Sequence, residues 1–271
     1  MVLVVEQRMS NYIGALEIQG RVIKALFLRE MKTRFGETRL GFVWAFIEPI
    51  IHVLSIILIW DILGRMGPQG INTILFLVTG VVPFIMFSNI LNKTMNSIAG
   101  NKALLVFPQI KPIDFIISRI VVEFTTYIMV FLGFVLGCIY FNIDTRIENV
   151  LGVFTQFTLI ALLGGGIGYI LMPLTSMFRV TQYIVSFAIK ALYLSSGIIF
   201  AIERLPLYIT KYLSWNPLLQ IIYMLRADFF PQLHPRQEFG SIWYVISLIA
   251  ISWLFGIVLT KRTMIHIMTE K

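Results

Sequence analysis

Long apolar runs separated by short polar connections dominate the chain. Each run approaches the roughly 20 residues that an α-helix needs to cross about 30 Å of hydrocarbon. The pattern predicts six membrane-spanning helices, near residues 40–63, 71–90, 115–141, 149–175, 181–201 and 240–260. We therefore expect an all-α integral membrane protein in which residues 1–271 form a single transmembrane domain.

Composition supports this class. The chain is 58% hydrophobic and only 13% charged, whereas a soluble domain averages roughly 25% charged residues. A single cysteine, Cys138, lies in an apolar run and excludes an internal disulfide. Only MVLVV precedes Glu6, which is too short for a signal-peptide core, so we expect no cleaved leader.

Lys and Arg in the connections predict the orientation, because they gather on the cytoplasmic side. With the N-terminus inside, the inner segments carry Arg8, Arg21, Lys24, Arg29, Lys32, Arg34, Arg39, Lys102, Lys111, Arg179, Lys261, Arg262 and Lys271. The outer loops carry only Arg65, Arg146, Arg204, Lys211, Arg226 and Arg236. Both termini are therefore predicted to be cytoplasmic, and the net charge of +8 reflects topology rather than nucleic-acid binding.

Two amphipathic stretches are expected outside the spans. Residues 18–35 read as a helix lying on the membrane surface, with apolar and basic side chains on opposite sides. The alternative is a soluble helix packed on a partner. Residues 205–230 read as two short re-entrant or interfacial outer helices; Pro206 could start one, and Asn216 with Pro217 supplies a cap and first residue for the other.

Polar side chains inside the spans mark candidate sites. Trp44, Glu48 and His52 share one face of the first predicted span, and Tyr183, Phe187 and Lys190 share one face of the fifth. An ionisable side chain at membrane depth is a functional hypothesis by default. The structural alternative is that Lys190 pairs with Glu48 or Glu123.

Three further patterns favour structural interpretations. Arg119 and Glu123 are spaced for an ion pair along one helix. The polar stripe at 89–96 predicts that the second span continues past the membrane. The glycines at 164, 165, 166 and 168 follow no strand and precede no Lys-Ser/Thr, so they predict close helix contact rather than a phosphate loop.

Catalytic and nucleotide-binding patterns are missing from the sequence. It has no Walker A motif, and its three histidines lack metal-ligand spacing. We therefore expect a non-enzymatic chain with no metal, and with energy for transport supplied by another chain or by an ion gradient. Six spans form a small bundle for a large solute, which favours a pathway between two copies.

Three segments of the chain resemble those of a known protein family. They are REMKTRFGETRLGFVWAFIEPI (29–50), NKALLVFPQIKP (101–112) and NPLLQIIYMLR (216–226). The chain resembles the membrane subunit of ABC-2 type exporters, and within them the capsular polysaccharide export permeases, close to the O-antigen permeases. The resemblance covers nearly the whole chain.

The resemblance implies a homodimer of six-span subunits with two separate ATPase subunits, which would bind ATP and magnesium. It implies that residues 99–113 form a cytoplasmic coupling helix seated in the ATPase, with Asn101, Leu104, Leu105, Phe107 and Pro108 as contacts. The resemblance also implies that residues 205–230 form a periplasmic gate, which includes Pro206, Trp215, Asn216 and Pro217. The first and fifth spans would line the channel through Trp44, Glu48, His52, Tyr183, Phe187 and Lys190.

The substrate implied is a lipid-linked, acidic capsular polysaccharide crossing the bacterial inner membrane. A periplasmic adaptor and an outer-membrane channel are implied as further partners. Our own hypothesis is that Lys190 meets a phosphate or carboxylate of the lipid-linked end. The alternatives are an exporter of O-antigen, teichoic acid or a small drug, a proton-coupled transporter using Glu48, Glu123 and Lys190, and a structural envelope-assembly factor.

Overall fold

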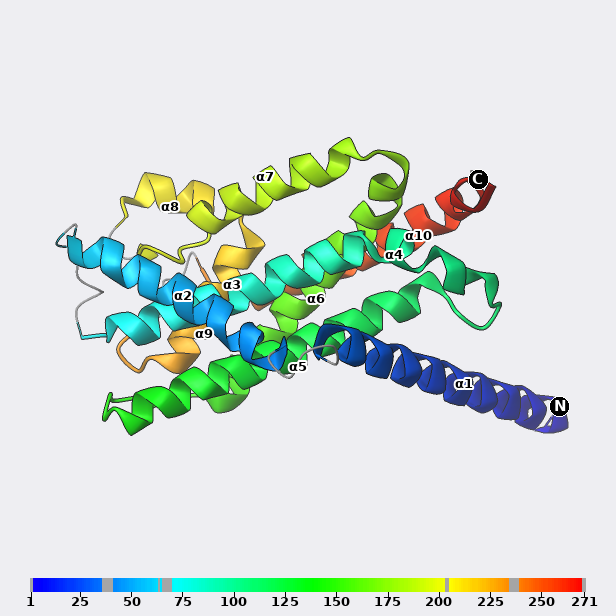
Figure 1. Cartoon of the computed structure of the whole chain (residues 1–271), viewed down its shortest axis with the longest axis horizontal. Coiled ribbons are helices and arrows are strands. Elements are labelled where there is room, and N and C mark those ends of the chain that lie inside the picture. Colours follow the sequence, from blue (N-terminus) through cyan, green and yellow to red (C-terminus); the bar gives the residue numbers. More distant parts are fainter. Residues whose placement is uncertain are drawn as a thin grey trace.

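The computed structural model describes residues 2–35, 41–62, 64, 70–202, 205–233 and 239–269. Across these ranges the secondary structure is helical, without a strand (Figure 1). Five helices are long and apolar enough to cross a membrane. These are α2 (Gly41–Ile62), α3 (Thr73–Met95), α5 (Pro112–Tyr140), α6 (Val150–Met177) and α10 (Ile242–Thr269). The predicted all-α membrane fold is confirmed at this level.

The shorter elements are α4 (Ser97–Asn101), the 3-10 turn η1 (Lys102–Val106), α7 (Val180–Ser195), α8 (Leu207–Leu213) and α9 (Pro217–Phe229). A long helix, α1 (Val2–Phe35), extends beyond the bundle, and both chain ends lie toward the same end of the molecule (Figure 1). Of the charges counted above, Arg39, Arg65, Arg204, Arg236 and Lys271 fall outside the described residues.

The fifth predicted span is shorter than the sequence pattern indicated. We expected 181–201, but α7 has 16 residues, a length of about 24 Å. It ends at Ser195, two residues before Gly197, whose φ of +68° lies in the left-handed region that terminates helices. The chain from 196 to 201 is therefore irregular although it is apolar and partly buried.

The centre of the bundle is α6, which packs against α3, α5, α7, α9 and α10. Its glycines lie where these helices come closest. A Cβ at Gly164 or Gly168 would press on α3, one at Gly165 would meet Ile120 of α5, and one at Gly166 would meet Trp253 of α10. The predicted role of these glycines in close helix contact is confirmed.

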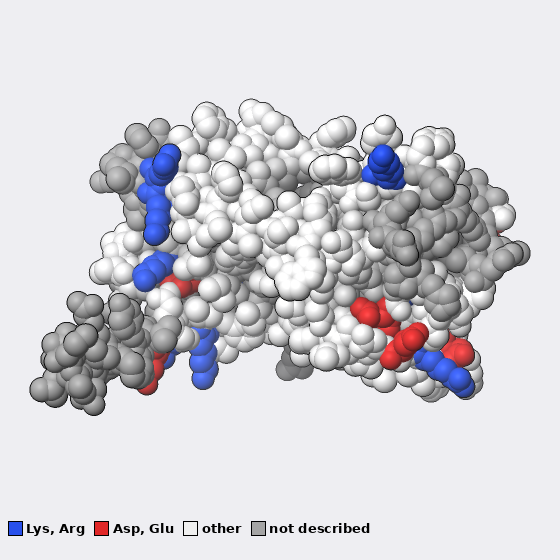
Figure 2. Space-filling model, turned by 180° about the vertical axis from the view of Figure 1, so that it is seen from behind, with Lys and Arg blue, Asp and Glu red and all other residues white. Residues whose placement is uncertain are grey.

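Charged side chains are unevenly distributed over the surface. Figure 2 shows Lys, Arg, Asp and Glu toward the two ends of one face, with a broad band between them that carries none. The helices crossing this band expose many large apolar side chains. An uncharged apolar band between charged ends is the surface expected of a protein embedded in a bilayer.

The α6 contacts generate a stability prediction. A Cβ on Gly168 would lie 2.7 Å from the Thr94 Cβ and 3.1 Å from the Leu91 carbonyl oxygen. Because α3 would have to move, Gly168→Ala should lower the free energy of unfolding by about 1–3 kcal/mol. The matched control is Gly137→Ala in α5, where nothing lies within 4 Å. Thermal unfolding in detergent should separate the two variants, and equal melting temperatures would contradict the close-packing account.

Candidate coupling and transport sites

The connection between α3 and α5 folds as several short pieces. We expected one helix over 99–113, but α4 ends at Asn101, η1 follows, and Phe107 is extended with φ −80° and ψ 119°. Lys111 is also extended. Each of these two residues precedes a proline, Pro108 or Pro112, and a residue before proline is disfavoured in the helical region. The prolines thus break the expected helix.

This connection has a buried side and an exposed side. Asn101 and Leu105 are buried, and Leu104 packs against the cluster that Leu105 forms with α1, α5 and α6 residues. Phe107 and Pro108 are exposed. The predicted contact surface is therefore divided: Asn101 and Leu105 belong to the interior of the chain. The sequence reading also missed Val106, which is 78% exposed beside Phe107 at 58%. We call residues 106–108 the exposed tip.

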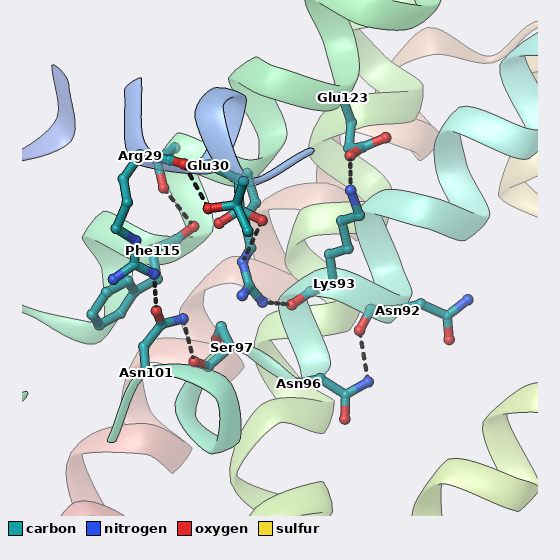
Figure 3. Close-up of polar contacts among 12 residues, drawn as sticks. Arg29, Glu30, Asn92, Lys93, Asn96, Ser97, Asn101, Phe115 and Glu123 are labelled. Carbon is teal, nitrogen blue, oxygen red and sulfur yellow. Dashed lines mark hydrogen bonds and ion pairs between the residues drawn. The ribbon is translucent and has the colours of Figure 1, made fainter. Parts of the chain in front are cut away.

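Polar contacts at the base of this tip join it to α1, and neighbouring contacts join α5 to α1 and α3 (Figure 3). Arg29 of α1 donates to the Asn101 side chain, whose amide donates to the Ser97 carbonyl 2.9 Å away. In α5, Arg119 donates to the Lys93 carbonyl and lies 3.7 Å from Glu30 of α1. These contacts attach the connection to α1 through Asn101 and hold α5 against α1 and α3 through Arg119.

The two charged residues expected to pair along α5 also take partners from other helices. Glu123 is fully buried and accepts a 2.5 Å hydrogen bond from Lys93 of α3, while Arg119 turns to Glu30 and the Lys93 carbonyl. Lys93 was read only as part of the polar stripe. The helix does run through the stripe, since α3 continues to Met95, beyond the predicted end of the span at residue 90. Helical spacing could not reveal these tertiary partners.

The candidate transport faces on α2 and α7 are open in the single chain. Trp44, Tyr183 and Phe187 are 65%, 78% and 75% exposed. The two helices meet where His52 lies 2.6 Å from the Tyr193 hydroxyl, and the Tyr193 ring packs edge-on against Phe84 of α3. The sequence reading missed Tyr193, although its position three residues after Lys190 places it on a neighbouring part of the same helix.

Lys190 and Glu48 are both exposed on these faces. Within the described ranges, Lys190 makes no ion pair, and Glu123 has Lys93 as its cationic partner instead. The structural alternative in which Lys190 pairs with Glu123 is therefore not observed. Over the same ranges, no group of three His, Cys, Asp or Glu side chains is arranged to hold a metal ion.

The outer helices begin as the sequence indicated. Pro206 occupies the position just before the first residue of α8, and the Asn216 side chain accepts hydrogen bonds from Leu218 N and Leu219 N at 3.0 and 3.3 Å. Pro217 is the first residue of α9. Trp215, between the two helices, is exposed and its carbonyl accepts a hydrogen bond from Tyr244 of α10.

Two charged residues of α9, to which the sequence analysis gave no structural role, attach it to the bundle. Arg226 is buried and donates to the carbonyls of Gly197, Phe76 and Ile198 at 2.6, 3.1 and 3.1 Å. It thereby binds the irregular backbone after α7, which would otherwise lack partners in an apolar setting. Asp228 accepts hydrogen bonds from Asn149 and Gln156 of the α6 region.

Comparison with known proteins agrees with this architecture. The family model described as ABC-2 type transporter matches residues 21–230. The chain is 34% identical to the polysialic acid transport protein KpsM of Escherichia coli over 218 residues, 80% of this chain and 84% of KpsM. The chain belongs to the ABC-2 type transporter family.

Two other relatives are a second capsule export protein and an O-antigen export permease. The capsule polysaccharide export inner-membrane protein CtrC of Neisseria meningitidis is 27% identical over 95% of this chain and 96% of CtrC. The O-antigen export system permease protein RfbA of Myxococcus xanthus is 25% identical over 79% of this chain and 82% of RfbA.

The attachment of α9 yields a second prediction. Arg226→Met leaves buried carbonyls without their donor, at about 1–3 kcal/mol for each unsatisfied group. We expect at least about 2 kcal/mol of lost stability in denaturant unfolding, with Arg226→Lys intermediate because it keeps the charge but has fewer donors. The control is Lys211→Met on α8, an exposed cation. A stable Arg226→Met variant would refute the role of this arginine.

Proposed function

We propose that the chain is the permease subunit of an ATP-driven exporter that moves capsular polysaccharide across the bacterial inner membrane. Membership of the ABC-2 type family supports this, as do the roles of KpsM in polysialic acid transport and of CtrC in capsule polysaccharide export. The chain itself is a non-catalytic transmembrane component, and ATP and magnesium would bind to a separate ATPase chain. Both termini would be cytoplasmic, in keeping with their position at one end of the bundle (Figure 1).

The observation that carries the proposal is the two-sided connection between α3 and α5. Its outer side offers Val106, Phe107 and Pro108 to a partner, while its inner side is fixed by Leu105 and Asn101. An apolar projection on a rigid base suits a contact that transmits motion, since displacement of the tip moves its base. The contacts of Asn101 and Arg119 would pass that displacement to α1, α3 and α5.

The pathway would form between two copies of the chain. In this arrangement α7 and the irregular residues after it complete a sixth crossing, because Arg226 satisfies the backbone that leaves the helix. The exposed aromatic faces of α2 and α7 would line the route. Aromatic rings can pack against the apolar C–H faces of sugar rings, and weak individual contacts permit a polymer to slide.

The outer helices would then divide their roles. Asp228 and Arg226 anchor α9, whereas α8 carries exposed Tyr208 and Tyr212. We infer that α8 with Trp215 is the movable part of a periplasmic gate and that α9 is its fixed support. On the cytoplasmic side, residues 18–35 of α1 would rest at the membrane surface while Leu26 packs into the bundle.

The choice of an acidic, lipid-linked capsular polymer over O-antigen or teichoic acid rests on the relatives. The polysialic acid transport protein KpsM is 34% identical over 80% of this chain, whereas the O-antigen permease RfbA is 25% identical over 79%. The proton-coupled alternative required Glu48, Glu123 and Lys190 to act together. Glu123 is instead buried against Lys93, which favours the ATP-driven mechanism. A periplasmic adaptor and an outer-membrane channel remain part of the proposal.

The coupling contact can be tested by charge substitution. Val106→Asp/Phe107→Asp places two carboxylates in the proposed interface, where burying a charge without a partner is strongly unfavourable. The ATPase should no longer co-purify, while the permease should keep its melting temperature because both side chains are exposed. Tyr208→Asp/Tyr212→Asp on α8 is the control, which should retain the ATPase. Normal co-purification of the tip variant would contradict the contact.

A separate test addresses the transport face. Lys190→Met should reduce polymer export roughly tenfold, which corresponds to the loss of about 1.4 kcal/mol from one charge-assisted contact. Lys190→Arg should restore most of the export, and ATPase co-purification should be unchanged in both variants. Export by Lys190→Met at the wild-type rate would remove Lys190 from the pathway.

A further inference from the structure

An apolar groove lies between α2 and α5 on the surface of the bundle. Its volume is about 430 Å³, and its lining is entirely apolar, with Phe46 and Ile50 on one side and Gly133, Gly137 and Cys138 on the other. Both helices qualify as membrane spans. A groove at this depth adjoins hydrocarbon rather than water. We call it the α2–α5 groove.

Two glycines of α5, Gly133 and Gly137, line the α2–α5 groove. A Cβ on Gly133 would lie 2.8 Å from the Phe46 ring, so this glycine lets α2 approach α5. At Gly137, one helical turn further, nothing lies within 4 Å of the Cβ position. The groove is therefore open at Gly137, where a Cβ would meet no neighbour and a larger side chain would extend into the groove.

A polar pocket of about 710 Å³ adjoins the groove at the outer end of the bundle. Ile143 lines both cavities, and Leu75 of the pocket follows Ile74 of the groove. The pocket is also lined by Asp144 and Arg146, whose side chains are 3.7 Å apart and more than three-quarters exposed. A carboxylate and a guanidinium thus lie close together next to the apolar α2–α5 groove.

We propose that the groove and the pocket together bind one phospholipid of the outer leaflet. An acyl chain would lie in the groove, and a zwitterionic phosphoethanolamine headgroup would lie in the pocket. The guanidinium of Arg146 suits the phosphate, since Arg forms paired hydrogen bonds with phosphate oxygens. The carboxylate of Asp144 suits the ammonium group, so the pair matches both charges of this headgroup.

The groove lies away from the proposed polymer pathway. Helical spacing places Phe46 and Ile50 on the side of α2 opposite Glu48 and His52. The occupant is therefore assigned to the surrounding bilayer rather than to the transported polymer. This inference does not depend on the proposed export function, because any membrane-embedded form of the chain would present the same groove.

The test uses the full chain, with any co-purifying subunits, in vesicles of phosphatidylethanolamine and phosphatidylglycerol. The vesicles contain a phosphatidylethanolamine probe with a photoactivatable acyl chain and no polysaccharide, so the lipid anchor of an export substrate cannot produce a signal. After illumination, mass spectrometry maps the labelled residues. We expect labelling concentrated on residues 133–143 and on the facing side of α2.

Variants of the groove and of the pocket test whether the labelling depends on these two sites. Gly137→Leu should reduce groove labelling at least about fivefold, because it fills the cavity. Leu136→Trp, on the same helix but outside the groove, should leave the labelling unchanged. Arg146→Gln should reduce phosphatidylethanolamine labelling without filling the groove, and thus provides a second variant if Gly137→Leu folds poorly. Uniform labelling of all lipid-facing helices, equal labelling of all variants, or cross-links joining two chains through the groove would overturn the proposal.

Discussion

Close approach of α3, α5 and α10 to the glycine face of α6 is the constraint on which the other features depend. Membrane helices gain little from burying apolar surface against one another, because lipid is also apolar, and so they associate where small residues allow close packing. Here Gly165 faces α5 and α10, while Gly164 and Gly168 face α3. This packing sets the position of α3 and α5, whose facing ends are joined by the connection that carries the exposed tip.

The connection between α3 and α5 has one side in the protein interior and one side exposed. Leu105 joins a cluster with Leu26, Ile98 and Phe115, so the segment is part of the chain's own interior. Pro108 and Pro112 prevent a continuous helix, and Phe107 therefore projects outward. The pairing of Arg119 with Glu30 and of Lys93 with Glu123 holds the helices beneath it in register. A rigid base is needed if force applied at the tip is to reach the transport faces.

Local patterns in the sequence predicted the features that local physics controls. Apolar length located the helices, Asn216-Pro217 located the start of α9, and the surroundings of the α6 glycines distinguished close packing from a phosphate loop. The fifth span was too long in the prediction, because an apolar run does not reveal that Gly197 takes a left-handed conformation. The backbone after this ending is satisfied by the distant Arg226, which donates to the carbonyls of Gly197 and Ile198.

The partners of charged residues were the least predictable part of the site. Arg119 and Glu123 have the spacing of an ion pair along one helix, yet each takes a partner from another helix. Asn101 and Leu105 resembled surface residues of a coupling helix but face inward, because α1 covers that side. The candidate transport residues Trp44, Tyr183 and Phe187 were placed on open faces of the chain. Their role depends on what lies opposite them in the assembled protein.

Native mass spectrometry of the intact complex, purified gently from its own membrane, tests the central claim most directly. The account predicts two copies of this 31.1 kDa chain together with two copies of a nucleotide-binding subunit. A monomer or a dimer without an ATPase, even after cross-linking in the membrane, would contradict an ATP-driven permease and would favour a gradient-driven mechanism.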